Sequence, residues 1–186
     1  MAVYDQLGAT ACRILVPGYS EVYPVEDLIW DNTNKALLFR ADILNLHDLD
    51  DASLEALLER LDNNELDDYS DIATLIGIEF DENTAWGQLT VLELKLLINL
   101  ALRQFETAQE LLGTFLQYND NTVERGLFYQ TLNVVLEVQL DDALELADYV
   151  VNFSRMFGHP RMDAVLGSVD GSVRFFGLTP TSMKLE

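Results

Sequence analysis

Cysteine, histidine and proline are scarce in this sequence. Of its 186 residues, one is cysteine, two are histidine and four are proline. A lone cysteine excludes a disulfide framework and suits a reducing compartment. No charged and apolar leader follows Met1, and the longest apolar-rich stretch, residues 89–102, contains polar residues and is too short to span a bilayer. Together these absences predict a cytoplasmic protein.

Basic residues are few as well. Eleven lysines and arginines stand against 32 acidic residues, which gives a net charge of −21 at pH 7. This balance excludes nucleic acid as a partner, because phosphate neutralisation needs clustered lysine and arginine, and it excludes anionic membrane surfaces for the same reason. Residues 42–82 contain fourteen acidic residues and a single base, Arg60. This acidic stretch is either a solvated face that aids solubility or a docking patch for a basic partner.

No segment has the pattern of an active site. His47 and His159 have no cysteine or serine at a suggestive spacing, and Cys12 lies among apolar neighbours. Residues 48–59 match the first, third and twelfth positions of a calcium loop, but positions five and six are alanine and serine, where a ligand and a glycine are needed. No glycine-rich phosphate-binding pattern occurs. The sequence therefore predicts no catalytic, cofactor-binding or metal-binding residue in this chain.

What the sequence does contain is helical periodicity, which predicts a mainly α fold. Residues 3–7 read as the last turn of a helix and residues 12–16 as a strand that Pro17-Gly18 ends. Asp51 is a plausible cap for one later helix, and Thr90 with Glu93 has the spacing of a capping box. The other expected helices begin at Tyr23-Pro24 and after residues 31–34, lie within residues 50–65 and 66–80, where Gly77 ends the second of them, and cover residues 90–103, 105–118, 122–139, 141–157 and 162–169.

The second half of the chain repeats itself at an offset of 35 residues. This offset pairs Ala108 with Ala143, and in the preceding helices Leu97 with Leu132. A period near 34 residues in pairs of helices is typical of tetratricopeptide-like arrays, although the characteristic residues of the ideal repeat are missing. Such hairpins leave a groove that usually binds a peptide or another protein.

Two groups of polar residues are candidates for binding a partner. The first lies within the acidic stretch, and the second recurs at every fourth position of the apolar helix at 90–103, so that its members share one face. This face is either simply exposed or part of a groove. The first group is Asp67, Asp68 and Asp71, and the second is Lys95, Asn99 and Arg103.

The stretch "VYDQLGATACRILVPGYSEVYPVEDL" closely resembles the segment that ends the YcaO domain and enters the carboxy-terminal region of gammaproteobacterial YcaO proteins. Further on, "NTAWGQLTVLELKLLINLAL", "NDNTVERGLFYQTLN" and "GSVRFFGLTP" look like the helical region of the same proteins. The resemblance covers essentially the whole chain. It implies that this chain is the carboxy-terminal fragment of an ATP-dependent enzyme that activates amide carbonyls by phosphorylation, and that the fragment itself lacks ATPase activity. The bacterial housekeeping form is implicated as an accessory factor in β-methylthiolation of a ribosomal protein.

Four parts follow from this resemblance. They are the end of the YcaO catalytic domain as a helix and strand at 1–24, an acidic helical linker region at 25–89, tetratricopeptide-like helical repeats at 90–178, and a tail at 179–186.

The expected function is that of a non-catalytic interaction and scaffolding module. Its expected partners are the protein's own catalytic YcaO domain, a basic ribosomal protein or modification enzyme, or a second copy of the chain. No cofactor is expected here, whereas ATP and magnesium are expected for the full-length protein. Two alternatives stay open: a stand-alone acidic hydrolase, metal-dependent or carboxylate-based, and a purely structural cover for the edge of the catalytic domain.

Overall fold

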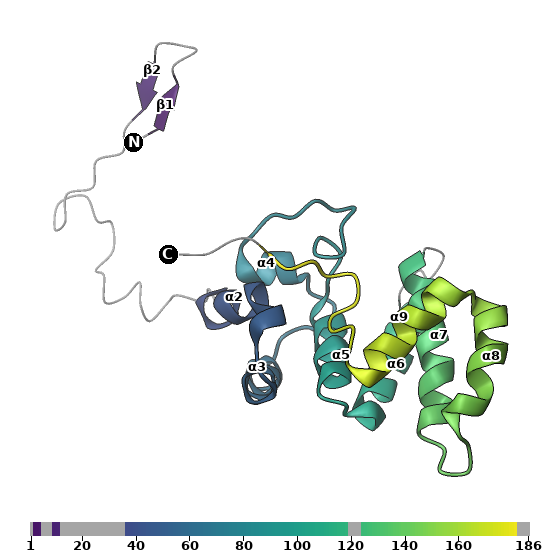
Figure 1. Cartoon of the computed structure of the whole chain (residues 1–186). Helices are drawn as coiled ribbons and strands as arrows, with labels where there is room; N and C mark the ends of the chain where they lie inside the picture. Colours follow the sequence, from purple (N-terminus) through teal and green to yellow (C-terminus); the bar gives the residue numbers. More distant parts are fainter. Residues whose placement is uncertain (1, 5–8, 12–35, 119–123, 182–186) are drawn as a thin grey trace. The chain divides into compact units, whose positions relative to one another are not determined.

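The structure is a computed structural model that describes residues 2–4, 9–11, 36–118 and 124–181 (Figure 1). It divides the chain into two compact units, Met1–Asn34 and Lys35–Glu186. All the named elements of the second unit are helices, which confirms the mainly α class.

The described part of the first unit is a pair of short antiparallel strands. Strand β1 (Ala2–Tyr4) pairs with β2 (Ala9–Ala11), with Val3 opposite Thr10. The expected helix at residues 3–7 is therefore wrong at Val3 and Tyr4, whose β-branched and aromatic side chains favour extended backbone. The strand expected at 12–16 and the helix expected at Tyr23-Pro24 lie outside the described residues.

The second unit holds eight described α-helices and one short 3-10 helix. They are α2 (Ala36–Leu44), η2 (Leu46–Asp48), α3 (Asp51–Asn63), α4 (Ile72–Ile76), α5 (Val91–Ala101), α6 (Phe105–Tyr118), α7 (Glu124–Gln139), α8 (Leu146–Phe157) and α9 (His159–Asp170). Helix α2 packs on α4 and α3 packs on α5. Helix α5 also contacts α6 and α9, α6 contacts α7, and α7, α8 and α9 contact one another.

The N-terminus of α3 is capped one residue earlier than the sequence indicated. Asp50, rather than Asp51, has extended backbone and accepts a hydrogen bond from the Ser53 N–H at 2.9 Å. Asp51 is instead the first helical residue and pairs with Arg174 at 3.1 Å. An aspartate at either position suits the positive end of the helix, so the sequence alone did not decide between them.

We expect Asp50→Ala to lower the free energy of unfolding, and acidification to reduce this difference. The hydrogen bonds from Ser53 hold the pKa of Asp50 below its usual value. A carboxyl with a lowered native pKa stabilises the fold above its unfolded pKa, and that contribution is lost as the pH falls through the native pKa. Urea denaturation at pH 7 and at pH 3 measures both values. Glu55→Gln, at an exposed position of the same helix, is the control, and an equal effect of the two changes would contradict the capping role.

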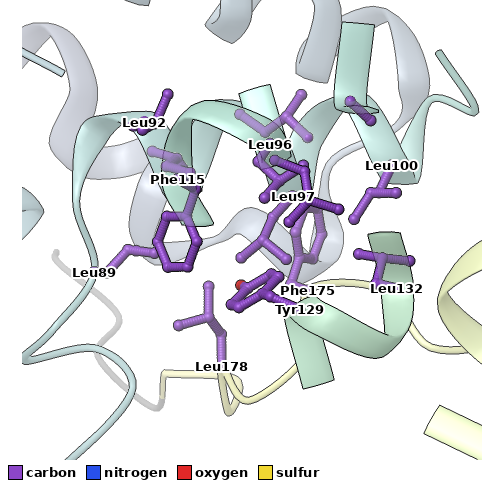
Figure 2. Packing of buried hydrophobic residues seen from close by; sticks show 14 of the residues in the cluster. Leu89, Leu92, Leu96, Leu97, Leu100, Phe115, Tyr129, Leu132, Phe175 and Leu178 are labelled. Carbon is purple, nitrogen blue, oxygen red and sulfur yellow. The ribbon is translucent and has the colours of Figure 1, made fainter. Parts of the chain in front are cut away.

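Helix α5 is the centre of the core. Thr90 caps it by accepting a hydrogen bond from the Glu93 N–H at 3.3 Å, as the capping-box spacing predicts. From Val91 to Leu100 every residue except Lys95 is buried, so α5 is covered on all sides. Figure 2 shows that the buried cluster joins leucines of α5 to aromatic side chains of α6 and α7, and to Phe175 and Leu178 beyond α9.

Residues that the 35-residue offset pairs agree in burial at some positions and differ at others. Leu97 and Leu132 are both buried, as the offset requires. Ala108 is buried in α6, but Ala143 is exposed in a turn, because α8 begins at Leu146 and not at residue 141. The carboxylate of Asp141 accepts a hydrogen bond from the Ala143 N–H at 2.9 Å, which favours a turn over the first turn of a helix. The tetratricopeptide-like assignment stays a prediction.

Helix α9 is longer than residues 162–169. It begins at His159, directly after Gly158, and Pro160 occupies its first turn, where a missing N–H has no consequence. Gly171, in left-handed backbone, ends it. For the segment that follows, the sequence predicts two glycine turns with a brief helix or a strand, but its described residues, which reach Thr181, form neither a helix nor a strand.

Residues 172–181, the carboxy-terminal segment, run back across the earlier helices. The His47 Nε2 donates to the carbonyl oxygen of Leu178 at 3.0 Å, and the Trp86 indole donates to that of Thr179 at 2.9 Å. Thr181 donates its hydroxyl to the carbonyl oxygen of Leu44 at 2.6 Å. These contacts hold the segment that follows α9 against α2, η2 and the loop before α5.

Candidate functional site

The acidic stretch lies on the surface of the second unit. Of its fourteen acids, all but Asp42 and Asp68 have exposed side chains. Four of them pair with bases among the described residues: Asp42 with Arg60, Asp51 with Arg174, and Asp62 and Asp68 with Lys95. The others have no ion pair within that part of the chain. The surface around α3 and α4 is therefore strongly negative.

Lys95 connects the two groups of candidate residues. Its ammonium lies 2.9 Å from the carboxylate of Asp62 and 3.1 Å from that of Asp68. Burial by itself would lower the pKa of Lys95, but the hydrogen bonds and charges of these two aspartates outweigh burial and raise it. Lys95 therefore stays charged and fixes the loop between α3 and α4 against α5.

Asp67 and Asp71 lie in that same loop with exposed side chains. Asp67 accepts a hydrogen bond from the Tyr69 N–H at 3.1 Å. Asp71 precedes the first residue of α4, and its side chain makes no capping hydrogen bond. Both carboxylates are thus available on the surface.

The expected polar stripe on α5 is not one exposed face. Asn99 is buried, and its amide donates to the carbonyl oxygen of Lys95 at 2.8 Å. Arg103 lies after α5 ends and has left-handed backbone with φ of 58°. The prediction of one shared face was wrong because it assumed that the helix continues to Arg103, whereas α5 ends at Ala101.

Arg103 does lie at a groove, one of the two alternatives that the sequence left open. Its guanidinium donates to the carbonyl oxygen of Asp170 at 2.6 Å. A groove of about 430 Å³ separates the end of α7 from the starts of α6 and α8 and the end of α9. It is lined by Arg103, Phe105, Gln139, Leu146, Leu166, Val169 and Asp170. The structure thus separates Arg103 from the acidic loop that holds Asp67, Asp68 and Asp71.

The structure contains a buried ionic cluster that the sequence analysis did not predict. Glu93 of α5 has a side chain only 1% exposed, and both of its carboxylate oxygens accept hydrogen bonds from Arg125 of α7, one of them at 2.9 Å. The Tyr129 hydroxyl donates to the same carboxylate at 2.5 Å. The Glu93 cluster, as we call these three residues, joins α5 to α7.

Burial and charge act in opposite directions in the Glu93 cluster. Burial raises the pKa of Glu93, and Arg125 and Tyr129 oppose this rise. Burial also raises the pKa of Tyr129 far above its usual value. Burial would lower the pKa of Arg125, but the charges and hydrogen bonds of Glu93 and Tyr129 together outweigh burial and raise that pKa. Arg125 is therefore the main group that favours the ionised form of the Glu93 carboxylate.

The sequence contains a signal for this cluster. Glu93, Leu97 and Leu100 stand at positions i, i+4 and i+7, so that Glu93 falls on an apolar stripe of α5. The sequence analysis considered Glu93 only as part of a capping box with Thr90. Arg125, on another helix, has no spacing that ties it to Glu93.

The described residues contain no group of three or more histidine, cysteine, aspartate or glutamate side chains that could hold a metal ion. A second hollow of about 440 Å³, beside α4, includes Asp71, Glu79 and Glu82, but these acids are exposed. Nothing among those residues favours the hydrolase alternative. None of the described helices is long and apolar enough to cross a membrane.

Comparison with known proteins gives one family and two relatives. The family model described as the YcaO cyclodehydratase C-terminal domain matches residues 36–186. A protein of Haemophilus influenzae named "Uncharacterized protein" is 34% identical over 190 residues, which cover 98% of this chain and 32% of that protein. The "Ribosomal protein S12 methylthiotransferase accessory factor YcaO" of Escherichia coli is 30% identical over 190 residues, which cover 100% of this chain and 32% of that protein. The chain thus spans about a third of the length of each relative.

Proposed function

Because the chain belongs to the family of YcaO C-terminal domains, we propose that it is a non-catalytic helical module through which a YcaO protein contacts other proteins. The module presents an acidic surface to a basic partner. The catalytic work, with ATP and magnesium, belongs to another part of the same protein, and the site of action is the cytoplasm.

The observation that carries this proposal is the exposed and largely unpaired acidic surface around α3 and α4. Exposed carboxylates without a nearby base repel one another, which is a cost to stability that a binding role would explain. Complementary charge speeds the encounter of two proteins and suppresses wrong partners. The surface is therefore suited to steering a positively charged protein toward the enzyme.

The name of the Escherichia coli relative indicates which basic protein to test. It is an accessory factor of an enzyme that modifies a ribosomal protein. Proteins that bind ribosomal RNA carry clustered lysine and arginine, because they neutralise phosphates. We propose that the acidic surface docks that ribosomal protein or its modifying enzyme. Support of the catalytic domain and assembly of a dimer are compatible roles for the remaining helices.

Charge reversal tests the docking role. We expect Asp67→Lys with Asp71→Lys to weaken binding of the basic ribosomal protein about tenfold at low salt, and less at physiological salt, because added salt screens exposed charges. Calorimetric titration of the 186-residue chain at both salt concentrations measures this change. Asp68 is left in place, since its loss would also release Lys95.

The matched control reverses the same number of charges elsewhere. Asp142 and Glu145 are exposed acids in the turn between α7 and α8. Equal weakening by Asp142→Lys with Glu145→Lys would mean that net charge alone attracts the partner, with no dock near α4. No heat of binding at either salt would refute substrate docking and leave the scaffold role.

A further inference from the structure

Two exposed tyrosines meet on the surface of the second unit. Tyr69 lies in the loop between α3 and α4, and Tyr118 is the last residue of α6. Their side chains are 50% and 66% exposed, and their rings are in edge-to-face contact with centroids 5.3 Å apart. Large aromatic side chains contribute to stability mainly by burial, and these two are left largely in water. A pair of exposed aromatic rings in contact therefore indicates a binding surface.

The loop that carries Tyr69 is held in place. The backbone N–H groups of Val91 and Leu92 donate to the carbonyl oxygens of Ser70 and Asp68, at 3.1 and 2.9 Å. The Ile72 N–H donates to the carbonyl oxygen of Leu89 at 2.8 Å. The ring of Tyr69 is thus presented by a fixed backbone, which lowers the ordering cost of binding.

Negative charge surrounds this pair of rings. Partial loss of water, the neighbouring Tyr118 and the charges of Asp68 and Asp67 together raise the pKa of Tyr69. Lys95 already pairs with Asp68, whereas Asp67 makes no ion pair within the described part of the chain. The rings offer π faces and the loop offers a carboxylate, and both attract a cation.

We propose that Tyr69 and Tyr118 form a docking site for an arginine side chain of a basic protein segment. The tyrosine rings, rather than the acids, carry this inference. A guanidinium is planar and weakly hydrated, so it stacks on an aromatic face while its N–H groups reach a carboxylate such as that of Asp67. A lysine ammonium is a compact, strongly hydrated charge and gains less from the rings. The inference rests on the proposed function, a basic protein partner, and adds what that partner must contain.

Two peptides of equal charge test the preference. One is twelve residues of alternating arginine and glycine, and the other has lysine in place of arginine. We expect the 186-residue chain to bind the arginine peptide several-fold more tightly than the lysine peptide. Tyr69→Leu with Tyr118→Leu should weaken binding of the arginine peptide about five- to thirtyfold, so that it no longer binds more tightly than the lysine peptide. Tyr69→Phe with Tyr118→Phe keeps both rings and should keep the advantage.

The control removes exposed apolar side chains elsewhere. Val151 and Met156 of α8 are 60% and 71% exposed, which matches the tyrosines. Val151→Ala with Met156→Ala should leave both peptides unaffected. Thermal melting of every variant checks that each one folds, which is expected because all four positions are exposed.

The outcomes separate this inference from the proposed function. Equal binding of both peptides, insensitive to the tyrosines but weakened by Asp67→Lys with Asp71→Lys, would overturn the arginine site and leave the acidic dock intact. Binding of neither peptide nor the ribosomal protein would overturn both. Self-association of the chain that is lost in the leucine variant would assign the rings to a second copy, and would also overturn the arginine site.

Discussion

Replacing Arg125 by methionine should lower the free energy of unfolding by about 3–5 kcal/mol at pH 7. Arg125 supplies the positive charge for Glu93, which is almost completely buried and accepts hydrogen bonds from that guanidinium on both oxygens. Without Arg125, only the Tyr129 hydroxyl remains as a donor among the described contacts of that carboxylate. A buried charge without a counter-charge is among the few causes of large single-residue destabilisation. Urea denaturation of the 186-residue chain measures the change.

The loss should shrink as the pH falls toward 5. Burial raises the pKa of Glu93, and removal of Arg125 removes the strongest opposing charge, so that pKa rises further in the variant. A carboxyl whose native pKa exceeds its unfolded value of about 4.3 binds more protons in the native state, so stability falls as the pH rises between the two values. The variant therefore loses most stability at neutral pH. There Glu93 either carries an unpaired charge or binds a proton that a solvent-exposed carboxyl would have released.

Two controls isolate the buried charge. Arg60→Met removes an arginine from a half-exposed pair with Asp42 and should cost no more than about 1 kcal/mol. The triple change Glu93→Leu, Arg125→Met and Tyr129→Phe removes all the polar groups of the Glu93 cluster together and should restore much of the stability. A deficit of less than 1 kcal/mol for Arg125→Met, with no dependence on pH, would show that water satisfies Glu93.

The contrast between Glu93 and Thr90 shows which part of the structure could be read from the sequence. Thr90 caps the helix that begins at Val91 as its spacing predicts, because a cap depends on four consecutive residues. The buried role of Glu93 depends on Arg125, which is brought into contact by the packing of α5 on α6 and of α6 on α7. Local pattern carries no information on such a pairing.

The start of α8 and the position of Arg103 also depend on contacts that local sequence patterns do not reveal. Periodicity predicted α8 but not where it begins. The hydrogen bond that the Asp141 carboxylate accepts from the Ala143 N–H favours a turn at residues where the sequence predicted the first turn of the helix. Lys95, Asn99 and Arg103 were placed on one face by spacing, yet only tertiary packing decides that Asn99 is buried and that α5 ends before Arg103. For the candidate site, composition predicted the acidic surface, while the contact of Tyr69 with Tyr118, far apart in the sequence, required the fold.

The carboxy-terminal segment is the part of the core whose role the sequence showed least. The sequence predicted two glycine turns with a brief helix or strand there, yet Phe175 is buried in edge-to-face contact with His47, with ring centroids 5.4 Å apart. Phe176 stacks on Phe128 of α7 with centroids 3.6 Å apart. One short segment thus contributes aromatic side chains that pack against both η2 and α7.

Phe175→Ala should lower the free energy of unfolding by about 3–5 kcal/mol, the usual range for removal of a buried phenyl group. The loss is expected to be large because Phe175 lies in the same buried cluster as Leu97 and Tyr129, and because the hydrogen bonds of His47 and Trp86 to the segment depend on its position (Figure 2). Urea denaturation of the full chain measures it. Val173→Ala, two residues earlier at a side chain 37% exposed, should change stability by no more than about 0.5 kcal/mol.

Phe175→Gly separates side-chain packing from backbone conformation. Phe175 has left-handed backbone with φ of 57°, which costs a residue with a side chain about 1 kcal/mol or more and costs glycine little. The glycine variant should therefore be more stable than the alanine variant, although both lose the ring. If the two variants are equally unstable, the left-handed turn does not persist once the ring is removed. If Phe175→Ala is no worse than Val173→Ala, the segment is not part of the core, and the acidic helices are held to α5 by their own contacts alone.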